Sequence, residues 1–141
     1  MSLFDPFLDS TRHAMMLTQE IVGRYGGECV DTEHIVLALL EVDESALLPL
    51  FEERGLTIDA YRERLAREPH GTPTEVTELA FSAEAKNLFK LAFARAQESH
   101  SNFVSDEHLL AALSSMPQCK GAIYLLGLGF DLEAIRARMS E

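Results

Sequence analysis

Two Glu-His pairs have the clearest capacity for chemistry in this 141-residue sequence: Glu33-His34 and Glu107-His108. A carboxylate beside an imidazole can serve acid–base catalysis in a small hydrolase, and imidazole is also a frequent zinc ligand. No cysteine or further carboxylate accompanies either pair at a repeated ligand spacing, and no nucleophile elbow surrounds the serines. We therefore interpret both histidines as hydrogen-bonded packing residues and expect no metal, no cofactor and no catalysis. A hydrolase is the alternative if either imidazole faces solvent in a pocket.

The two pairs belong to a longer internal repeat. Residues 32–39 are echoed by residues 106–113, so that Glu107 follows Glu33 by 74 positions. A chance motif match would not continue along the chain, but this one does, without a gap. The same offset relates Phe7 to Phe81, Leu17 to Leu91, Val30 to Val104, Gly55 to Gly129 and Ala60 to Ala134.

The offset divides the chain into two repeats, expected at 5–67 and 79–141. The linker, 68–78, contains two prolines and a glycine, which cannot sustain a helix. Apolar residues recur at helical spacing in both repeats, and no segment alternates as a strand does. The sequence therefore predicts an all-α fold of about eight short helices, four in each repeat.

Capping residues and helix breakers indicate where these helices begin and end. Asp5 with Pro6 is expected to start the first helix, and Gly26-Gly27 to end it. Four other helices are expected to start at Asp31 or Thr32, at Thr57, at Ser82 and at Ser105 or Asp106. Three more are expected to span residues 46–54, 121–128 and 132–139. The Met15-Met16 pair, Phe89 and Phe93 lie on apolar faces and are expected in the core.

Composition excludes several classes of protein. Hydrophobic residues make up 47%, which suffices for a globular core, and the formal net charge of −11 repels phosphate backbones and anionic lipid. Nucleic acid and membranes are therefore not expected partners. No apolar run is long enough to span a bilayer, the N-terminus does not resemble a signal peptide, and two cysteines cannot form a disulfide framework. These features together favour a cytoplasmic protein.

The paired motifs resemble the Clp repeat domain found at the N-terminus of Hsp100 unfoldases, with the ClpC branch as the nearest likeness. The family pattern is close to GTEH followed by apolar residues; this chain has residues 31–34 and 105–108 in those places, and the likeness covers nearly the whole chain. The resemblance implies a pseudo-twofold double Clp repeat that binds substrates and adaptor proteins. It also implies two related pockets for phosphorylated arginine.

The resemblance places Glu33 and Glu107 at the guanidinium-binding positions, beside Thr32 and Asp106 at the helix starts. A carboxylate can pair with a guanidinium, and a helix start can hold a phosphate. The alternative is that both glutamates merely complement helix dipoles, worth about 0.3–1 kcal/mol.

The two predicted pockets are not equal. Ser82 matches a hydroxyl residue of the family, whereas its counterpart in repeat one, Leu8, is apolar. Asp31 and Asp106 depart from the pattern and add negative charge near the expected phosphate. The sequence thus favours the second pocket, assigned to Ser82 and Glu107.

The expected role is that of a monomeric protein-binding module whose partners are a Clp ATPase or its substrates and adaptors. No GxxxxGK[ST] phosphate loop is present, so ATP hydrolysis by this chain is not expected. The module would act free-standing in trans or as the N-terminal domain of a ClpC-like ATPase, and the termini slightly favour the former. The alternative is a helical docking partner without phosphoarginine recognition.

Overall fold

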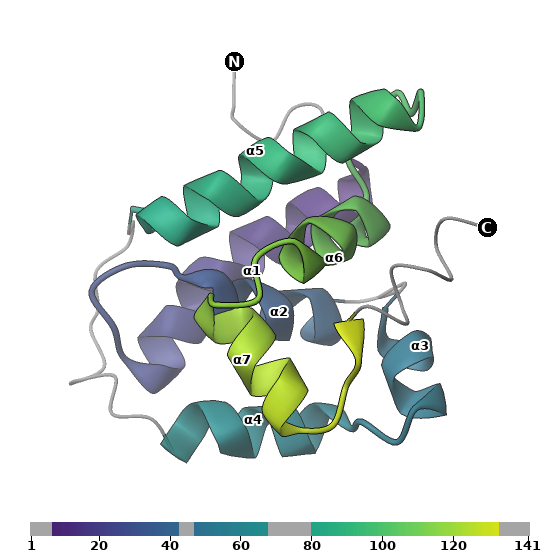
Figure 1. Cartoon of the computed structure of the whole chain (residues 1–141). Coiled ribbons are helices and arrows are strands. Elements are labelled where there is room, and N and C mark those ends of the chain that lie inside the picture. Colours follow the sequence, from purple (N-terminus) through teal and green to yellow (C-terminus); the bar gives the residue numbers. More distant parts are fainter. Residues whose placement is uncertain (1–6, 43–46, 68–79, 133–141) are drawn as a thin grey trace.

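The computed structural model describes residues 7–42, 47–67 and 80–132, and Figure 1 shows their arrangement. Within these residues the fold is all-α, as the sequence predicts, with two isolated β-bridges and no strand. The helices are α1 (Asp9–Tyr25), α2 (Thr32–Glu41), α3 (Leu48–Glu53), α4 (Ile58–Arg67), α5 (Ala83–Glu98), α6 (Asp106–Ser114) and α7 (Lys120–Gly127).

The first helix begins later than the sequence suggested. It starts at Asp9 with Leu8 as its N-cap residue, so the expected start at Asp5 and Pro6 was wrong. Phe7 is extended and pairs with Val104, and the Leu8 N–H donates to the Val104 carbonyl at 2.9 Å. A residue held in this bridge cannot adopt helical dihedrals, which delays the helix by one turn.

The remaining starts agree with the sequence to within two residues. Thr57 caps α4 by accepting the Ala60 N–H at 3.1 Å, and Ser82 caps α5 by accepting the Ala85 N–H at 3.0 Å. The linker at 68–78 and all but the first residue of the expected eighth helix, 132–139, lie outside the described residues.

The first residues of each repeat pair with the backbone of the other repeat. Phe7 pairs with Val104, and the partners related to them by the 74-residue offset, Phe81 and Val30, form the second bridge. Each repeat therefore places the start of its first helix beside the Glu-His motif of the other repeat. This symmetric exchange joins the repeats through backbone hydrogen bonds as well as through the core.

Helix α2 lies at the centre of the core. It contacts α1, α3, α4, α5 and α7, and in Figure 1 it lies between α5 at the top and α4 at the bottom. Every residue from Thr32 to Leu40 is buried, because neighbours cover all sides of this helix. Glu33, which the sequence assigned to ligand binding, is consequently inside the molecule.

The core predictions hold with one exception. Met15 and Phe89 are buried and Phe93 is half-buried, but Met16 is 66% exposed. Successive residues of a helix point about 100° apart, so α1 can direct only one of the two methionines into the core.

Candidate functional site

The histidine of each motif is part of a capping box. Asp31 is the N-cap of α2 and Ser105 is the N-cap of α6, and the third residue of each helix is a histidine. The Nδ1 atom of His34 accepts the Asp31 N–H at 3.0 Å, and that of His108 accepts the Ser105 N–H at 2.9 Å. Histidine thus takes the place that Glu or Gln usually has in this motif. Both are hydrogen-bonded, as predicted, and their first role is to start helices.

The same bonds argue against a hydrolase. His34 is buried. His108 is half-buried, and because burial lowers its pKa despite the opposing effect of Glu107, the neutral ring is favoured. Since Nδ1 accepts a hydrogen bond, Nε2 carries the proton and faces the Ser99 Oγ at 3.1 Å. A general base acting on a serine would need its lone pair at Nε2, so this tautomer is the wrong one.

Glu33 and Thr32 lie inside the protein. The Glu33 side chain is 2% exposed, and the Lys120 Nζ atom lies 3.8 Å from its Oε2 atom. The Tyr61 hydroxyl donates to the Glu33 carbonyl at 2.7 Å. Thr32 is fully buried, and its Oγ1 atom accepts the Gly121 N–H at 2.9 Å. These contacts use the first motif to join α2 to α4 and α7.

Ser82 belongs with the first motif. Its hydroxyl donates to the Asp31 Oδ1 atom at 2.7 Å, at the start of α5. Glu107 lies near the other end of α5, because the neighbouring His108 contacts Ser99 just after that helix ends. The structure therefore does not bring Ser82 together with Glu107, which the sequence assigned to one pocket. The exchanged repeat starts bring Leu8, and not Ser82, to the Glu107 motif.

Asp106 also differs from expectation. It is 2% exposed, and its Oδ1 atom accepts the Thr11 hydroxyl at 2.6 Å. Its carboxyl group is therefore directed into the interior, toward α1. The two motifs share a backbone geometry but place their acidic side chains differently.

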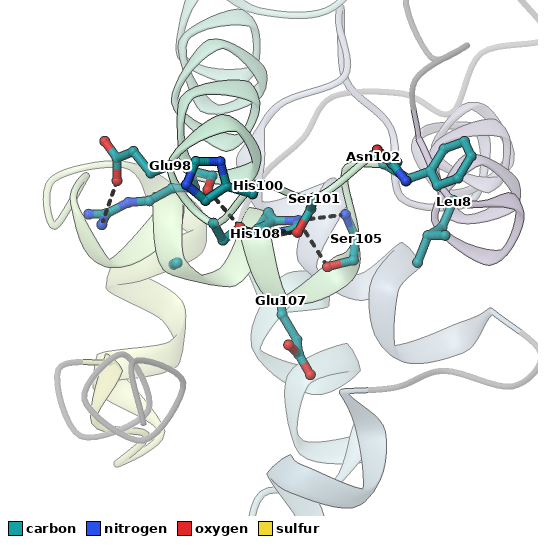
Figure 2. A pocket seen from close by; sticks show the side chains of 12 residues that line it. Leu8, Glu98, His100, Ser101, Asn102, Ser105, Glu107 and His108 are labelled. Carbon is teal, nitrogen blue, oxygen red and sulfur yellow. Dashed lines mark hydrogen bonds and ion pairs between the residues drawn. The ribbon is translucent and has the colours of Figure 1, made fainter.

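The second motif opens onto a hollow of about 820 Å³. Glu107 is exposed at this hollow, and Figure 2 shows its carboxylate directed away from the group formed by Ser101, Ser105 and His108. The full lining comprises Leu8, Arg95, Glu98, Ser99, His100, Ser101, Asn102, Phe103, Ser105, Glu107, His108 and Ala111. The hollow thus combines carboxylates, basic side chains and three serine hydroxyls.

His100 stands at a special backbone position in the hollow. Its φ is 56°, and it is the one non-glycine residue with positive φ in the described part of the chain. Its counterpart in repeat one is Gly26, with φ of 89°. Left-handed dihedrals favour glycine, so a histidine here costs backbone energy and places an imidazole at the hollow. Comparing His100 with Gly26 across the repeat would have marked this residue from the sequence.

The family is decided by comparison with known proteins. The model of the Clp repeat (R) N-terminal domain matches residues 7–127. The chain belongs to this family. The match includes both capping boxes and every residue of the hollow, so the features above are features of a Clp repeat domain.

Curated relatives are much longer than this chain. It is 29% identical over 139 residues to a ClpA homolog of Cyanidium caldarium, an ATP-binding subunit of an ATP-dependent Clp protease, and 27% identical to the chloroplastic chaperone protein ClpC2 of Oryza sativa subsp. japonica. Each alignment covers 98% of this chain but only 16% and 15% of the relative.

Solved structures show the same fold. The N-terminal domain of ClpD from Arabidopsis thaliana has a TM-score of 0.79 at 23% identity, covering 95% of this chain and 94% of that one. The Hsp104 N-terminal domain from Candida albicans has a TM-score of 0.75 at 16% identity, covering 94% and 88%. Among the described residues, none of the helices is both long and apolar enough to cross a membrane.

Proposed function

We propose that this Clp repeat domain captures protein substrates or adaptors for a Clp unfoldase by binding phosphoarginine side chains in the hollow beside Glu107. The observation that carries the proposal is the composition of that hollow. It presents an exposed carboxylate, the guanidinium of Arg95 and several hydroxyls within one concave surface. A ligand that carries both a guanidinium and a phosphoryl group needs both kinds of partner.

The chemistry can be assigned to individual groups. The Glu107 carboxylate pairs with the guanidinium, and this contact gains from charge-assisted hydrogen bonding. The phosphoryl oxygens accept from the hydroxyls of Ser101 and Ser105, which exchange their contacts with His108 for the ligand, and they face the guanidinium of Arg95. A volume of about 820 Å³ is in the range of small-ligand sites and exceeds a single side chain, which leaves room for flanking peptide.

Isothermal titration calorimetry with free phosphoarginine tests this assignment. The Glu107→Gln variant keeps the shape of the side chain but removes its charge, so we expect at least a tenfold loss of affinity, about 1.4 kcal/mol. Glu63→Gln, an exposed position on α4, is the matched control and should bind as the wild type does. Arginine alone and inorganic phosphate alone should each bind more weakly than phosphoarginine.

Two outcomes would reject the proposal. One is the absence of measurable phosphoarginine binding by the wild type, and the other is equal affinity in the wild type and Glu107→Gln. Capture of a Clp ATPase by the immobilised chain would separately support action in trans. Capture of substrates alone would support action as the receiving domain of a larger ATPase.

A second function, helical docking without phosphoarginine recognition, is favoured by the apolar rim of the same hollow. Leu8 is 41% exposed and Phe103 is 50% exposed, and these residues come from different repeats. Under this function, the Leu8→Ala plus Phe103→Ser double variant would lose a protein partner that Glu107→Gln retains. The opposite pattern of loss would support the phosphoarginine site.

A further inference from the structure

The two motif glutamates differ in access, although the 74-residue offset makes them equivalent. The Glu33 side chain is 2% exposed, whereas Glu107 is exposed at the hollow. The exposed fraction matters because a carboxylate binds a ligand cation only where that cation can approach it. The structure therefore gives the two sites unequal opportunities to bind.

Lys120 lies beside the buried Glu33 carboxylate, with its own side chain 59% exposed to solvent. It is the first residue of α7, and its Nζ atom lies 3.8 Å from the Glu33 Oε2 atom. The next residue, Gly121, fixes the position of α7, because its N–H donates to the Thr32 Oγ1 atom at 2.9 Å. A Cβ atom on Gly121 would lie 3.0 Å from the Thr32 carbonyl oxygen, so the two helix starts are in close contact.

The other polar groups of this site are also engaged internally. The Ser82 hydroxyl, which the family pattern assigns to a ligand, donates to Asp31 at 2.7 Å. Asp31 also accepts the Thr32 N–H at 2.8 Å. A ligand at Glu33 would have to displace an ammonium group and also compete for this serine.

The equivalent position in the other repeat has no amine. The residue 74 positions before Lys120 is Ala46. Within the described residues, no cation forms an ion pair with Glu107. The sequence difference between Lys120 and Ala46 therefore parallels the difference in access between Glu33 and Glu107.

We propose that Lys120 occupies the ligand-cation position at Glu33 and confines ligand binding to Glu107. Lys120 is thus a specificity-determining residue that reduces a two-site domain to a one-site domain. The identity of the ligand rests on the proposed function above, but the closure of Glu33 by Lys120 does not. The two ideas can therefore fail separately.

Carboxyl footprinting tests the closure without any ligand. The reagents are a water-soluble carbodiimide and glycine ethyl ester, and modification of each glutamate is quantified by mass spectrometry. In the wild type we expect Glu107 to be labelled and Glu33 to be at least tenfold slower. Lys120→Ala should increase the Glu33 rate several-fold, whereas Lys120→Arg and the exposed-lysine control Lys90→Ala should leave it slow. Fast labelling of Glu33 in the wild type, or continued protection in Lys120→Ala, would overturn the proposal.

Stoichiometry with phosphoarginine then links closure to binding. We expect one site per chain in the wild type and two in Lys120→Ala, with the double variant Lys120→Ala plus Glu107→Gln retaining one. Two sites in the wild type would overturn the closure while leaving the proposed function intact. If no variant binds phosphoarginine, the proposed function fails, and the footprinting result alone decides the role of Lys120.

Discussion

At the scale of single residues, environment decides what a carboxylate can do. Glu33, Asp106 and Glu107 all stand in the first turn of a motif helix, yet two are buried and one is exposed. The sequence alone predicts similar roles for them, because it shows their positions in the motif helices but not which side chains surround them. Their roles separate only when the neighbouring helices are in place.

Glu41 is a half-buried residue whose carboxylate has a structural role. Its side chain is 6% exposed and accepts two hydrogen bonds from Arg24, at 3.0 and 2.8 Å. Arg62 donates two more to the Oε1 atom, at 2.9 and 2.7 Å. The carboxylate therefore links the ends of α1 and α2 to α4. Burial alone would raise the pKa of Glu41, but the hydrogen bonds from both arginines outweigh it and lower the pKa.

We predict that Glu41→Gln lowers the free energy of unfolding by about 1–3 kcal/mol at pH 7, because hydrogen bonds to a charged group are lost. The pKa of Glu41 is lower in the folded than in the unfolded protein, so its charge contributes stability above the unfolded value near 4.5. That contribution is lost as the pH falls through the folded pKa.

Urea denaturation of both proteins at several pH values measures this difference. The gap between wild type and Glu41→Gln should be full at pH 6–7 and should shrink below about pH 4.5. Glu52→Gln, at an exposed position on α3, is the control and should change stability by less than about 0.5 kcal/mol. A gap that is constant with pH would show that Glu41 acts through packing and not through its charge.

At the scale of elements, the contact between α2 and α7 is the one on which both motif geometry and the closure of Glu33 depend. Gly121 permits it, since a side chain there would meet the backbone of Thr32 at 3.0–3.1 Å. A backbone neighbour cannot rotate away as a flexible side chain can. One of the helices must move to admit a methyl group.

Gly121→Ala is therefore predicted to lower stability by about 1–3 kcal/mol, as overpacking in a close contact does. The matched control is Gly127→Ala in the same helix, where a Cβ atom would meet nothing within 4 Å. This control should be neutral or stabilising by up to about 1 kcal/mol, since alanine favours a helix over glycine. Equal effects of the two substitutions in denaturant unfolding would refute the close contact.

Helix existence was easier to predict from the sequence than helix starts. Ser82 and Thr57 are capping residues whose role depends on local backbone, so the sequence identified them correctly. Asp5 and Pro6 form an equally good local signal, but Phe7 is held in a bridge with Val104 from the other repeat. A contact across 97 positions overrides local propensity and leaves no trace in the nearby sequence.

At the scale of the whole molecule, duplication was evident from the sequence but the exchange between repeats was not. The constant offset identifies Ser82 as the counterpart of Leu8 and Glu107 as the counterpart of Glu33. It does not say which of them meet. Because each first helix begins beside the opposite motif, Ser82 lies with Asp31, and Leu8 lies at the hollow of Glu107.

Residues that differ in type between the two repeats therefore lie beside the two Glu-His motifs. The 74-residue offset pairs Leu8 with Ser82, His100 with Gly26 and Ala46 with Lys120, and the residue type differs in each pair. Leu8 and His100 lie at the hollow of Glu107, and Lys120 lies at Glu33. A symmetric scaffold thus carries one open and one closed motif, which accords with a single ligand site for each chain.

A phosphoarginine titration followed by amide chemical shifts in a ¹⁵N-labelled sample tests this central claim most directly. We predict saturable shifts concentrated at residues 99–108, with little change at residues 31–34. Glu107→Gln should abolish these shifts at the same ligand concentrations. Shifts centred on residues 31–34, or no saturable shift in the wild type, would contradict a single phosphoarginine site at Glu107.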